Sequence, residues 1–293
     1  MLTLVGLCVV IIAVFGGYVL AGGHLNIILA ALPFELLIIG GAGVGIFLMA
    51  NDTTVLKRAV GDVVQTLKGP RWRKQDYNTL LCLLFELVRL ARTDPLALES
   101  HIENPDTSEI FGRYPRIRSD SFAVALICDY LRASSMNFDD PHQVSEIMER
   151  DLELHHAERL RPAQAMQALT DALPALGIVA AVLGVIKTMA SIDQPPSVLG
   201  KMIGGALVGT FLGVFLSYCL TGPLAARIRT IQEDDHRFYA LVRDVLVAYL
   251  HGHAPSICVE IGRKNVPGAL RPEFDEVEAA LNGLKVHAAK QAA

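Results

Sequence analysis

The stretch LPALGIVAAVLGVIKTMA (residues 173–190), followed by LGKMIGGALVGTFLGVFLSYCLTG (residues 199–222), decides the fold class. Each stretch is almost continuously apolar and has about the 20 residues that an α-helix needs to cross the hydrocarbon core of a bilayer. The segment between them, SIDQPPS (residues 191–197), is short and polar and contains two prolines. The pair therefore predicts two membrane-spanning helices joined by a tight turn.

The same criterion predicts four spans in all, at residues 2–19, 32–50, 169–190 and 199–222. The whole chain of 293 residues is 52% hydrophobic and only 19% charged, with a mean hydropathy of +0.39, which is too apolar for an ordinary soluble domain. We therefore expect an all-α integral membrane protein with four transmembrane helices and a large helical cytoplasmic domain. Its expected parts are a first transmembrane hairpin (1–50), a cytoplasmic helical loop domain (51–168), a second transmembrane hairpin (169–222) and a cytoplasmic helical extension with the C-terminal tail (223–293).

The distribution of basic residues predicts the orientation. Residues 1–50 contain no Lys or Arg, whereas basic side chains follow the second and fourth spans, at Lys57, Arg58, Arg71, Arg73, Lys74, Arg227 and Arg229. Positive charge near span ends stays on the cytoplasmic side, and Lys187 and Lys201 can reach the opposite interface from helix ends. We therefore expect a multi-pass protein of the cytoplasmic membrane with both termini and the large loop in the cytoplasm.

The polar segments also have helical periodicity. Apolar residues recur at helical spacing in residues 77–92, 121–133 and 224–250. Asp140 before Pro141 is typical of an N-cap followed by a first-turn proline, and it predicts a charged helix that runs toward Leu160.

Several classes of function are disfavoured by composition. A net charge of −4 provides no basic field for nucleic acid. The pairs His155–His156 and His251–His253 have no evident third ligand, so solvated surface is a better interpretation than a metal site. No arrangement of nucleophile and base is visible, so we expect neither an enzyme nor a cofactor.

Small residues mark the predicted packing surfaces of the spans. Gly205, Gly209 and Gly213 recur at every fourth position, and Gly177 and Gly184 lie one heptad apart in the preceding span. Such spacing lets helix backbones approach closely. It is equally compatible with packing inside one subunit and with oligomerisation.

The middles of the four predicted spans lack Asp, Glu, Lys and Arg, and Glu35 is predicted to lie near the outer end of the second span as an interfacial residue. An ion-translocating site normally needs an ionisable group at depth, so another chain would have to supply it. Pro174 cannot donate to the carbonyl of Thr170, and Thr210 offers a hydroxyl near the middle of the fourth span. From the residues alone, an ion path and a kink-and-packing role remain equally open.

A family resemblance follows from motifs along nearly the whole chain. They are VFGGYVLAGGHL (14–25), PFELLIIGGAGVGIF (33–47), IENPDTSEIFGRYPRI (102–117), LPALGIVAAVLGVIKTM (173–189), ALVGTFLGVFLSYCLTGPLA (206–225) and VEIGRKNV (259–266). In this order they resemble the MotA family of flagellar stator subunits. The resemblance implies a ring of five copies around a MotB dimer, whose membrane helix carries the ion-binding aspartate that these spans lack.

The resemblance also implies roles for particular residues. Pro174 and Thr210 correspond to ion-path positions, and Pro223 to a proline that couples the inner end of the fourth span to conformational change. Ala181 stands where sodium-driven relatives tend to carry threonine. Because a methyl group cannot coordinate sodium, the expected translocated ion is H⁺ rather than Na⁺.

Charged side chains in the loop are the expected contacts with the rotor protein FliG. The best matches to the basic and acidic positions of the family are Arg92 and Glu99, with Arg89 and Glu103 as substitutes because the interval is one residue shorter here. From the residues alone, these charges would simply solvate a helix face.

Two alternatives remain at this stage. One is a proton-driven energiser of the ExbB or TolQ type, although that design has three spans. The other is a non-conducting membrane scaffold in which glycines and prolines serve packing only.

Overall fold

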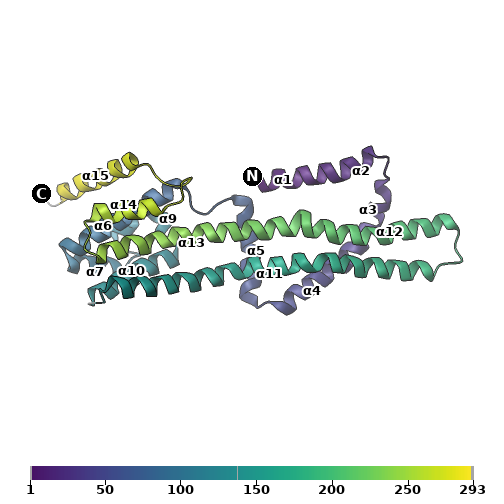
Figure 1. Ribbon diagram of the computed structural model, residues 1–293, viewed down its shortest axis with the longest axis horizontal. Coiled ribbons are helices and arrows are strands. Elements are labelled where there is room, and N and C mark those ends of the chain that lie inside the picture. The colour runs from purple at the N-terminus through teal and green to yellow at the C-terminus, as the bar shows by residue number, and fades with distance from the viewer. Residues whose placement is uncertain (1, 137, 292–293) are drawn as a thin grey trace. The chain divides into compact units, whose positions relative to one another are not determined.

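The computed structural model describes residues 2–136 and 138–291, in which every regular element is helical (Figure 1). The chain forms two compact units. The membrane unit comprises residues 1–70 and 158–232, and the loop unit comprises residues 71–157 and 233–293. The boundary at residues 70 and 71 lies in the linker between two helices, whereas α11 and α13 contribute residues to both units, so the other two boundaries lie inside helices.

Four helical segments are long and apolar enough to cross a membrane, as predicted. The first consists of α1 (Leu2–Ile11), a π-helical segment η1 (Ile12–Gly16) and α2 (Gly17–Leu20), and the second of α3 (Leu25–Glu35), the π-helical η2 (Leu36–Gly40) and α4 (Gly41–Ala50). The third lies in α11 (Pro141–Met189), and the fourth in α12 (Pro196–Phe215) with the π-helical η3 (Leu216–Thr221), which continues into α13 (Gly222–Leu250). In the membrane unit α11 and α12 lie side by side as an antiparallel pair (Figure 1).

The second span begins earlier than predicted. Its helix starts at Leu25 instead of residue 32, and Pro33 lies inside it. Proline is tolerated inside a membrane helix when neighbouring helices stabilise it, and α3 packs extensively against α12. As a result Glu35 is the last of the 11 residues of α3 and not a residue of the outer end. Glu35 is also buried, so the prediction that it is a hydrated or lipid-facing interfacial residue was wrong.

Helix α11 begins where predicted but does not end near Leu160. The Asp140 carboxylate accepts hydrogen bonds from the amides of His142 (2.9 Å) and Gln143 (3.0 Å), as an N-cap does. The helix then continues for 49 residues, through Pro162 and into the third span. Because no Gly-rich or multi-proline breaker lies between the two predicted elements, they form one continuous rod.

The loop unit is a helical core built on α6. Its helices are α6 (Lys74–Thr93), α7 (Pro95–Glu103), α8 (Glu109–Gly112), α9 (Pro115–Arg118), α10 (Ser121–Ser135), α14 (Pro255–Asn265) and α15 (Phe274–Gln291), with the adjoining parts of α11 and α13; α5 (Thr53–Lys68) belongs to the membrane unit. Leu80, Leu84 and Leu87 of α6 are fully buried, and the Trp72 ring stacks on Phe238 with centroids 4.0 Å apart. The predicted helices at 77–92, 121–133 and 224–250 are thus confirmed.

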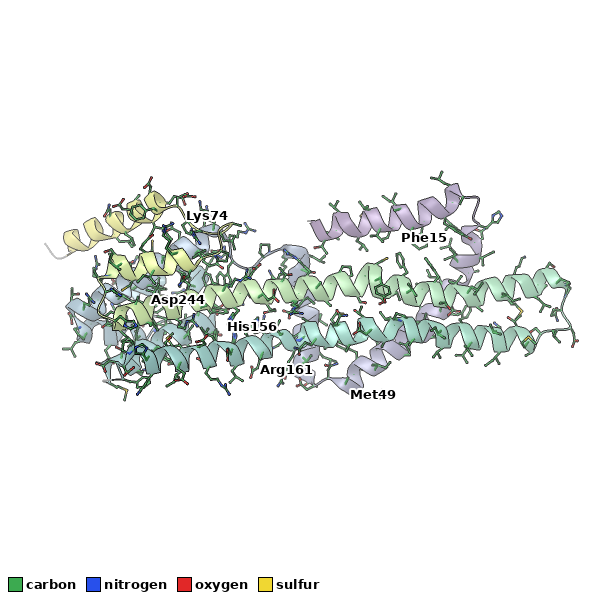
Figure 2. The ribbon with its side chains drawn as sticks, in the orientation of Figure 1. Phe15, Met49, Lys74, His156, Arg161 and Asp244 are labelled. Carbon is green, nitrogen blue, oxygen red and sulfur yellow. The ribbon has the colours of Figure 1, made fainter. Side chains whose placement is uncertain are left out.

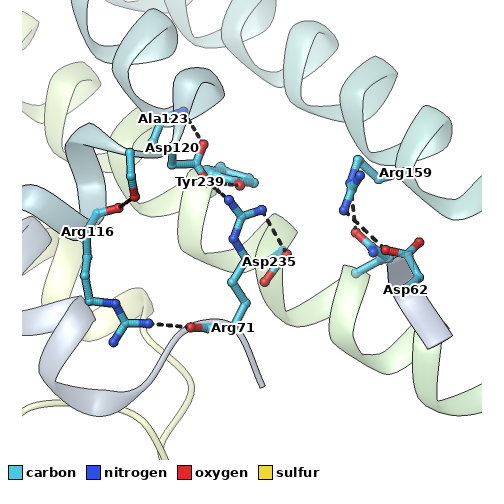
Figure 3. A network of polar contacts seen from close by, with 10 residues as sticks. Asp62, Arg71, Arg116, Asp120, Ala123, Arg159, Asp235 and Tyr239 are labelled. Atoms are coloured by element: carbon cyan, nitrogen blue, oxygen red, sulfur yellow. Dashed lines mark hydrogen bonds and ion pairs between the residues drawn. The ribbon is translucent and has the colours of Figure 1, made fainter. Parts of the chain in front are cut away.

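A buried carboxylate organises the polar interior of the loop unit (Figure 3). Asp120 caps α10 by accepting from the Ala123 amide (2.9 Å), accepts from the Tyr239 hydroxyl (2.9 Å) and pairs with Arg71. Arg71 also lies 3.8 Å from Asp235. Separate from this network, in the membrane unit, Arg159 pairs with Asp62 at 3.7 Å (Figure 3). Both clusters hold charged groups in place by pairing them, as buried charges require.

Candidate ion path and coupling surface

The antiparallel helices α11 and α12 are in backbone contact at two glycines. A Cβ added at Gly177 would lie 2.8 Å from the Gly209 carbonyl oxygen, and a Cβ at Gly213 would lie 2.7 Å from the Leu173 carbonyl oxygen. Real Cβ atoms do not approach backbone so closely, so only glycine fits at either position. These residues pack one helix of the chain against another, which is the use that membrane helices make of small residues.

The same contact continues toward the turn between the two helices. A Cβ at Gly184 would lie 2.6 Å from the Ala206 methyl group. Gly205 is different, because its nearest neighbour is the Ala31 methyl group of α3 at 4.0 Å. Gly205 therefore faces the second span with ordinary spacing, and it does not belong to the tight α11–α12 contact.

The first span packs through aromatic rings. Phe15 of η1 lies edge-on to Phe211 (centroids 6.0 Å apart) and to Phe215 (5.5 Å) on α12 (Figure 2). Edge-to-face pairs at this spacing are favourable. Many other side chains of this span are exposed, including Val9, Ile12 and Leu20. They fit a lipid or protein environment rather than water.

The predicted ion-path residues Ala181 and Thr210 lie at one level of the helix pair. A Cβ at Gly209 would lie 3.2 Å from the Ala181 amide nitrogen, and Thr210 is the next residue along α12. Both side chains are half-buried. Pro174 lies two turns away on α11 and is also half-buried, near the Gly177–Gly213 contact.

Glu35 lies at this same level, although sequence reasoning placed it elsewhere. Its Oε2 atom would be 2.7 Å from a Cβ at Gly209, so glycine there leaves room for the carboxyl group. Glu35 is only 7% exposed, and Oε2 has no hydrogen-bond partner among the described residues. The signal in the sequence was the apolar run before Pro33, which extends the helix back to Leu25 and makes Glu35 the last of its 11 residues.

The carbonyl that Pro174 leaves without an amide donor has a hydrogen-bond donor that the sequence did not reveal. The Ser217 hydroxyl of η3 donates to the Thr170 carbonyl at 2.8 Å, which is the carbonyl that proline leaves without an amide donor. The Thr170 hydroxyl lies 2.9 Å from the Thr221 hydroxyl and 2.9 Å from the Met166 carbonyl. We call Thr170, Ser217 and Thr221 the hydroxyl cluster. From the opposite helix, it supplies a donor for the carbonyl that Pro174 leaves without one.

Pro223 follows the hydroxyl cluster directly. It is exposed, and it lies two residues after the end of the π-helical segment η3. π-helical turns are frequent at functional sites, and proline at this point leaves the Cys219 carbonyl without its usual amide donor. The fourth span therefore has irregular hydrogen bonding where it continues into α13.

The candidate rotor residues lie in the loop unit and differ in their surroundings. Arg92 and Glu99 are exposed, and the Arg92 guanidinium lies 5.9 Å from the Tyr249 ring centroid. Arg89 is half-buried over the Phe85 ring at 5.8 Å. Glu103, in contrast, is paired with Arg132 at 2.5 Å. The hydrogen bond to Glu103 raises the pKa of Arg132, while desolvation lowers it. Arg92 and Glu99 are thus better placed to meet another protein than Glu103.

The histidine pairs do not form a metal centre in the part of the chain that is described. No group of three or more His, Cys, Asp or Glu side chains lies close enough to hold an ion there. His155 instead stacks on Phe122 with centroids 3.5 Å apart, and His156 lies 4.4 Å from His236.

Comparison with known proteins gives consistent matches along the chain. Residues 4–95 match the family model "Motility protein A N-terminal", and residues 121–238 match the "MotA/TolQ/ExbB proton channel family". Motility protein A of Salmonella typhimurium is 40% identical over 97% of this chain and 96% of its own length. Motility protein A of Escherichia coli is 38% identical with the same coverage.

Solved structures show that the fold is shared. The flagellar MotAB stator complex from Bacillus subtilis matches with a TM-score of 0.70 at 22% identity, covering 94% of this chain and 99% of that chain. The C. jejuni MotAB structure matches with a TM-score of 0.71 at 19% identity, over 91% and 95% of the two chains. Four spans and these full-length matches disfavour the three-span energiser and the scaffold. The chain belongs to the motility protein A family of flagellar stator subunits, membrane-embedded motor components that are not enzymes.

Proposed function

We propose that this chain assembles with MotB in the inner membrane and couples proton flow to torque on the rotor. The identity of 40% to Salmonella motility protein A across 97% of the chain carries this proposal. Five copies would surround a MotB dimer, with both termini in the cytoplasm. The basic residues that follow the second and fourth spans support that orientation.

The translocated ion is proposed to be H⁺. Ala181 and Thr210 lie at one level of the α11–α12 pair, where the Thr210 hydroxyl is the one side-chain oxygen that these two residues offer. Sodium requires several oxygen ligands, whereas a proton needs a single acceptor such as the MotB aspartate. Moving one charge through 100 mV yields about 2.3 kcal/mol, which is enough to shift helix-packing equilibria of similar size.

Torque transmission to FliG is assigned to the exposed charges of the loop unit. Arg92 lies in the last turn of α6 and Glu99 lies on α7, so helices that pack on a buried core hold both side chains. Opposite charges on FliG would pair with them as it passes. The ring motion would reach these charges along α11 and α13, which continue from the spans into the loop unit.

The decisive test is ion transport by the purified chain in liposomes, with and without MotB. With MotB, an imposed proton gradient should acidify the lumen and a sodium gradient alone should have no effect. Without MotB the chain should transport no protons, because its predicted ion path lacks the proton-accepting aspartate. Robust current without MotB, or flux that follows sodium only, would contradict the proposal. In cells, deletion of the gene should paralyse flagella while leaving filaments intact.

A further inference from the structure

Glu35 is a buried carboxyl group that the proposed mechanism does not use. It is 7% exposed, and its Oε2 has no hydrogen-bond partner among the described residues. Because Gly209 has no side chain, there is space beside it for the Glu35 carboxyl group. Ala181 and Thr210 lie at the same level of the helix pair as Gly209. An unpaired carboxylate at membrane depth is costly, so a residue of this kind generally has a function.

The group lies in a cavity of about 640 Å³ between α3, α11 and α12. Ala30, Ala31, Ala180 and Gly205 make much of the wall, whereas the polar lining residues other than Glu35 are Asn26, Lys187 and Lys201. Lys201 precedes Gly209 by eight residues, which corresponds to about 12 Å along the axis of α12. The cavity therefore leads from the ends of the spans nearest residues 191–195 down to Glu35.

The chemistry of the lining favours a proton over a metal cation. Glu35 and Asn26 are the cavity's side-chain carbonyl or carboxylate oxygens, and they lie nine residues apart on one helix, about 13 Å. A sodium ion bound at Glu35 would thus lack most of its ligands. The carboxylate, in contrast, needs only one proton from hydronium to become neutral, so it requires no further ligands.

We propose that Glu35 is a second protonation site, which loads protons from the cavity onto the ion path beside Thr210. This inference rests on the proposed function. The Glu35 carboxylate takes a proton from hydronium, which leaves water and a neutral carboxylic acid. The acid then passes that proton through water to the partner's aspartate, and the Glu35 carboxylate is restored.

The charged groups that face Glu35 in the cavity are few. Helix α11 contributes Lys187 and helix α12 contributes Lys201, while α3 contributes no second charge. Both lysines are exposed, and neither forms an ion pair with another described residue. Among the residues that line the cavity, Glu35 is the one acidic side chain.

Three variants of the full chain, produced together with MotB, test this site. Glu35→Gln removes the titratable group at nearly constant size, and Glu35→Asp retains it. Asp193→Asn is the matched control, because Asp193 is an exposed carboxylate in the turn at the same end of the spans but outside the cavity. Immunoblots of membranes establish that all three accumulate.

Motor rotation gives the first readout. At low load and an external pH of about 8, Glu35→Gln should turn at half the wild-type speed or less, because hydronium is scarce and proton loading limits the rate. The deficit should shrink near an external pH of about 6, and torque at stall should stay unchanged because the driving force is the same. Glu35→Asp should recover part of the speed, and Asp193→Asn should match the wild type.

Infrared difference spectra of the reconstituted complex give the second readout. A protonated-carboxyl band that responds to external pH should be absent from Glu35→Gln and present in Asp193→Asn. If Glu35→Gln does not accumulate, the band must shift in Glu35→Asp. Wild-type speed at every pH, or an unchanged band, overturns the proposal for Glu35. A wild-type complex that neither carries protons nor turns a motor would instead refute the proposed function.

Discussion

At the scale of single residues, the Ser217 hydroxyl replaces the backbone amide donor that Pro174 cannot offer to the Thr170 carbonyl. Ser217 is only 1% exposed, and its hydroxyl lies 2.8 Å from the Thr170 carbonyl. Without it, a buried acceptor would have no donor in a membrane, where water cannot take over. Pro174 is therefore accommodated by two helices, α11 that carries it and η3 that supplies Ser217.

Ser217→Ala should lower the free energy of unfolding by about 1 kcal/mol, the cost of leaving one buried carbonyl unsatisfied. In a Pro174→Ala background the same change should cost less, because alanine brings back the backbone amide donor that proline lacks. Thermal unfolding of the four proteins in detergent measures this cycle. Additive effects would show that Ser217 and Pro174 act independently.

At the scale of elements, α11 and α12 behave as one rigid pair because glycines bring their backbones together. The Cβ that Gly213 lacks would lie 2.7 Å from the Leu173 carbonyl and 2.8 Å from Gly177 Cα. Neither atom belongs to a flexible side chain, so a methyl group must push the helices apart. The helix pair also places Ala181, Thr210 and Glu35 at one level, so its geometry matters for the proposed ion path.

Gly213→Ala should destabilise the chain by about 1–3 kcal/mol through overpacking and should lower swimming speed as well. Gly200→Ala on the same helix is the matched control, because a Cβ there meets no atom within 4 Å. That control gains helix propensity and should be neutral or slightly stabilising. Equal unfolding temperatures in detergent for the two variants would disprove the tight contact.

At the scale of the whole molecule, the proposed transmission of torque requires that charges on the loop unit meet a partner outside the chain. Exposed charges contribute little to stability, about 0–1 kcal/mol per pair. Arg92 and Glu99 form no ion pair with another described residue, whereas Glu103 is occupied by Arg132. Their effect should therefore appear in motility and not in folding.

Reversal of both charges, Arg92→Glu with Glu99→Lys, should reduce swimming in soft agar several-fold, while membrane levels and unfolding temperature stay near those of the wild type. Asp106→Lys reverses another exposed charge of the loop unit and should swim normally. Compensating reversals on FliG should restore motility. Unimpaired swimming of the double variant would place the rotor contact elsewhere in the loop unit.

Much of the architecture follows from the sequence by itself. The length and apolarity of four segments determine four spans, because nothing else can satisfy backbone groups in lipid at that length. Helical periodicity predicted α6, α10 and α13, and the Asp140–Pro141 pair predicted where α11 begins. The glycine spacing predicted close packing without telling which helices would meet.

Only the tertiary structure decided which polar groups meet, because these meetings depend on contacts between segments far apart in the chain. The donor for the Thr170 carbonyl comes from Ser217, 47 residues away, so no local pattern reveals it. The burial of Glu35 depends on the packing of α3 against α12, where Gly209 leaves room for its carboxyl group. Local chemistry sets which segments become helices and spans, but which polar groups meet inside the membrane is determined by how those helices pack.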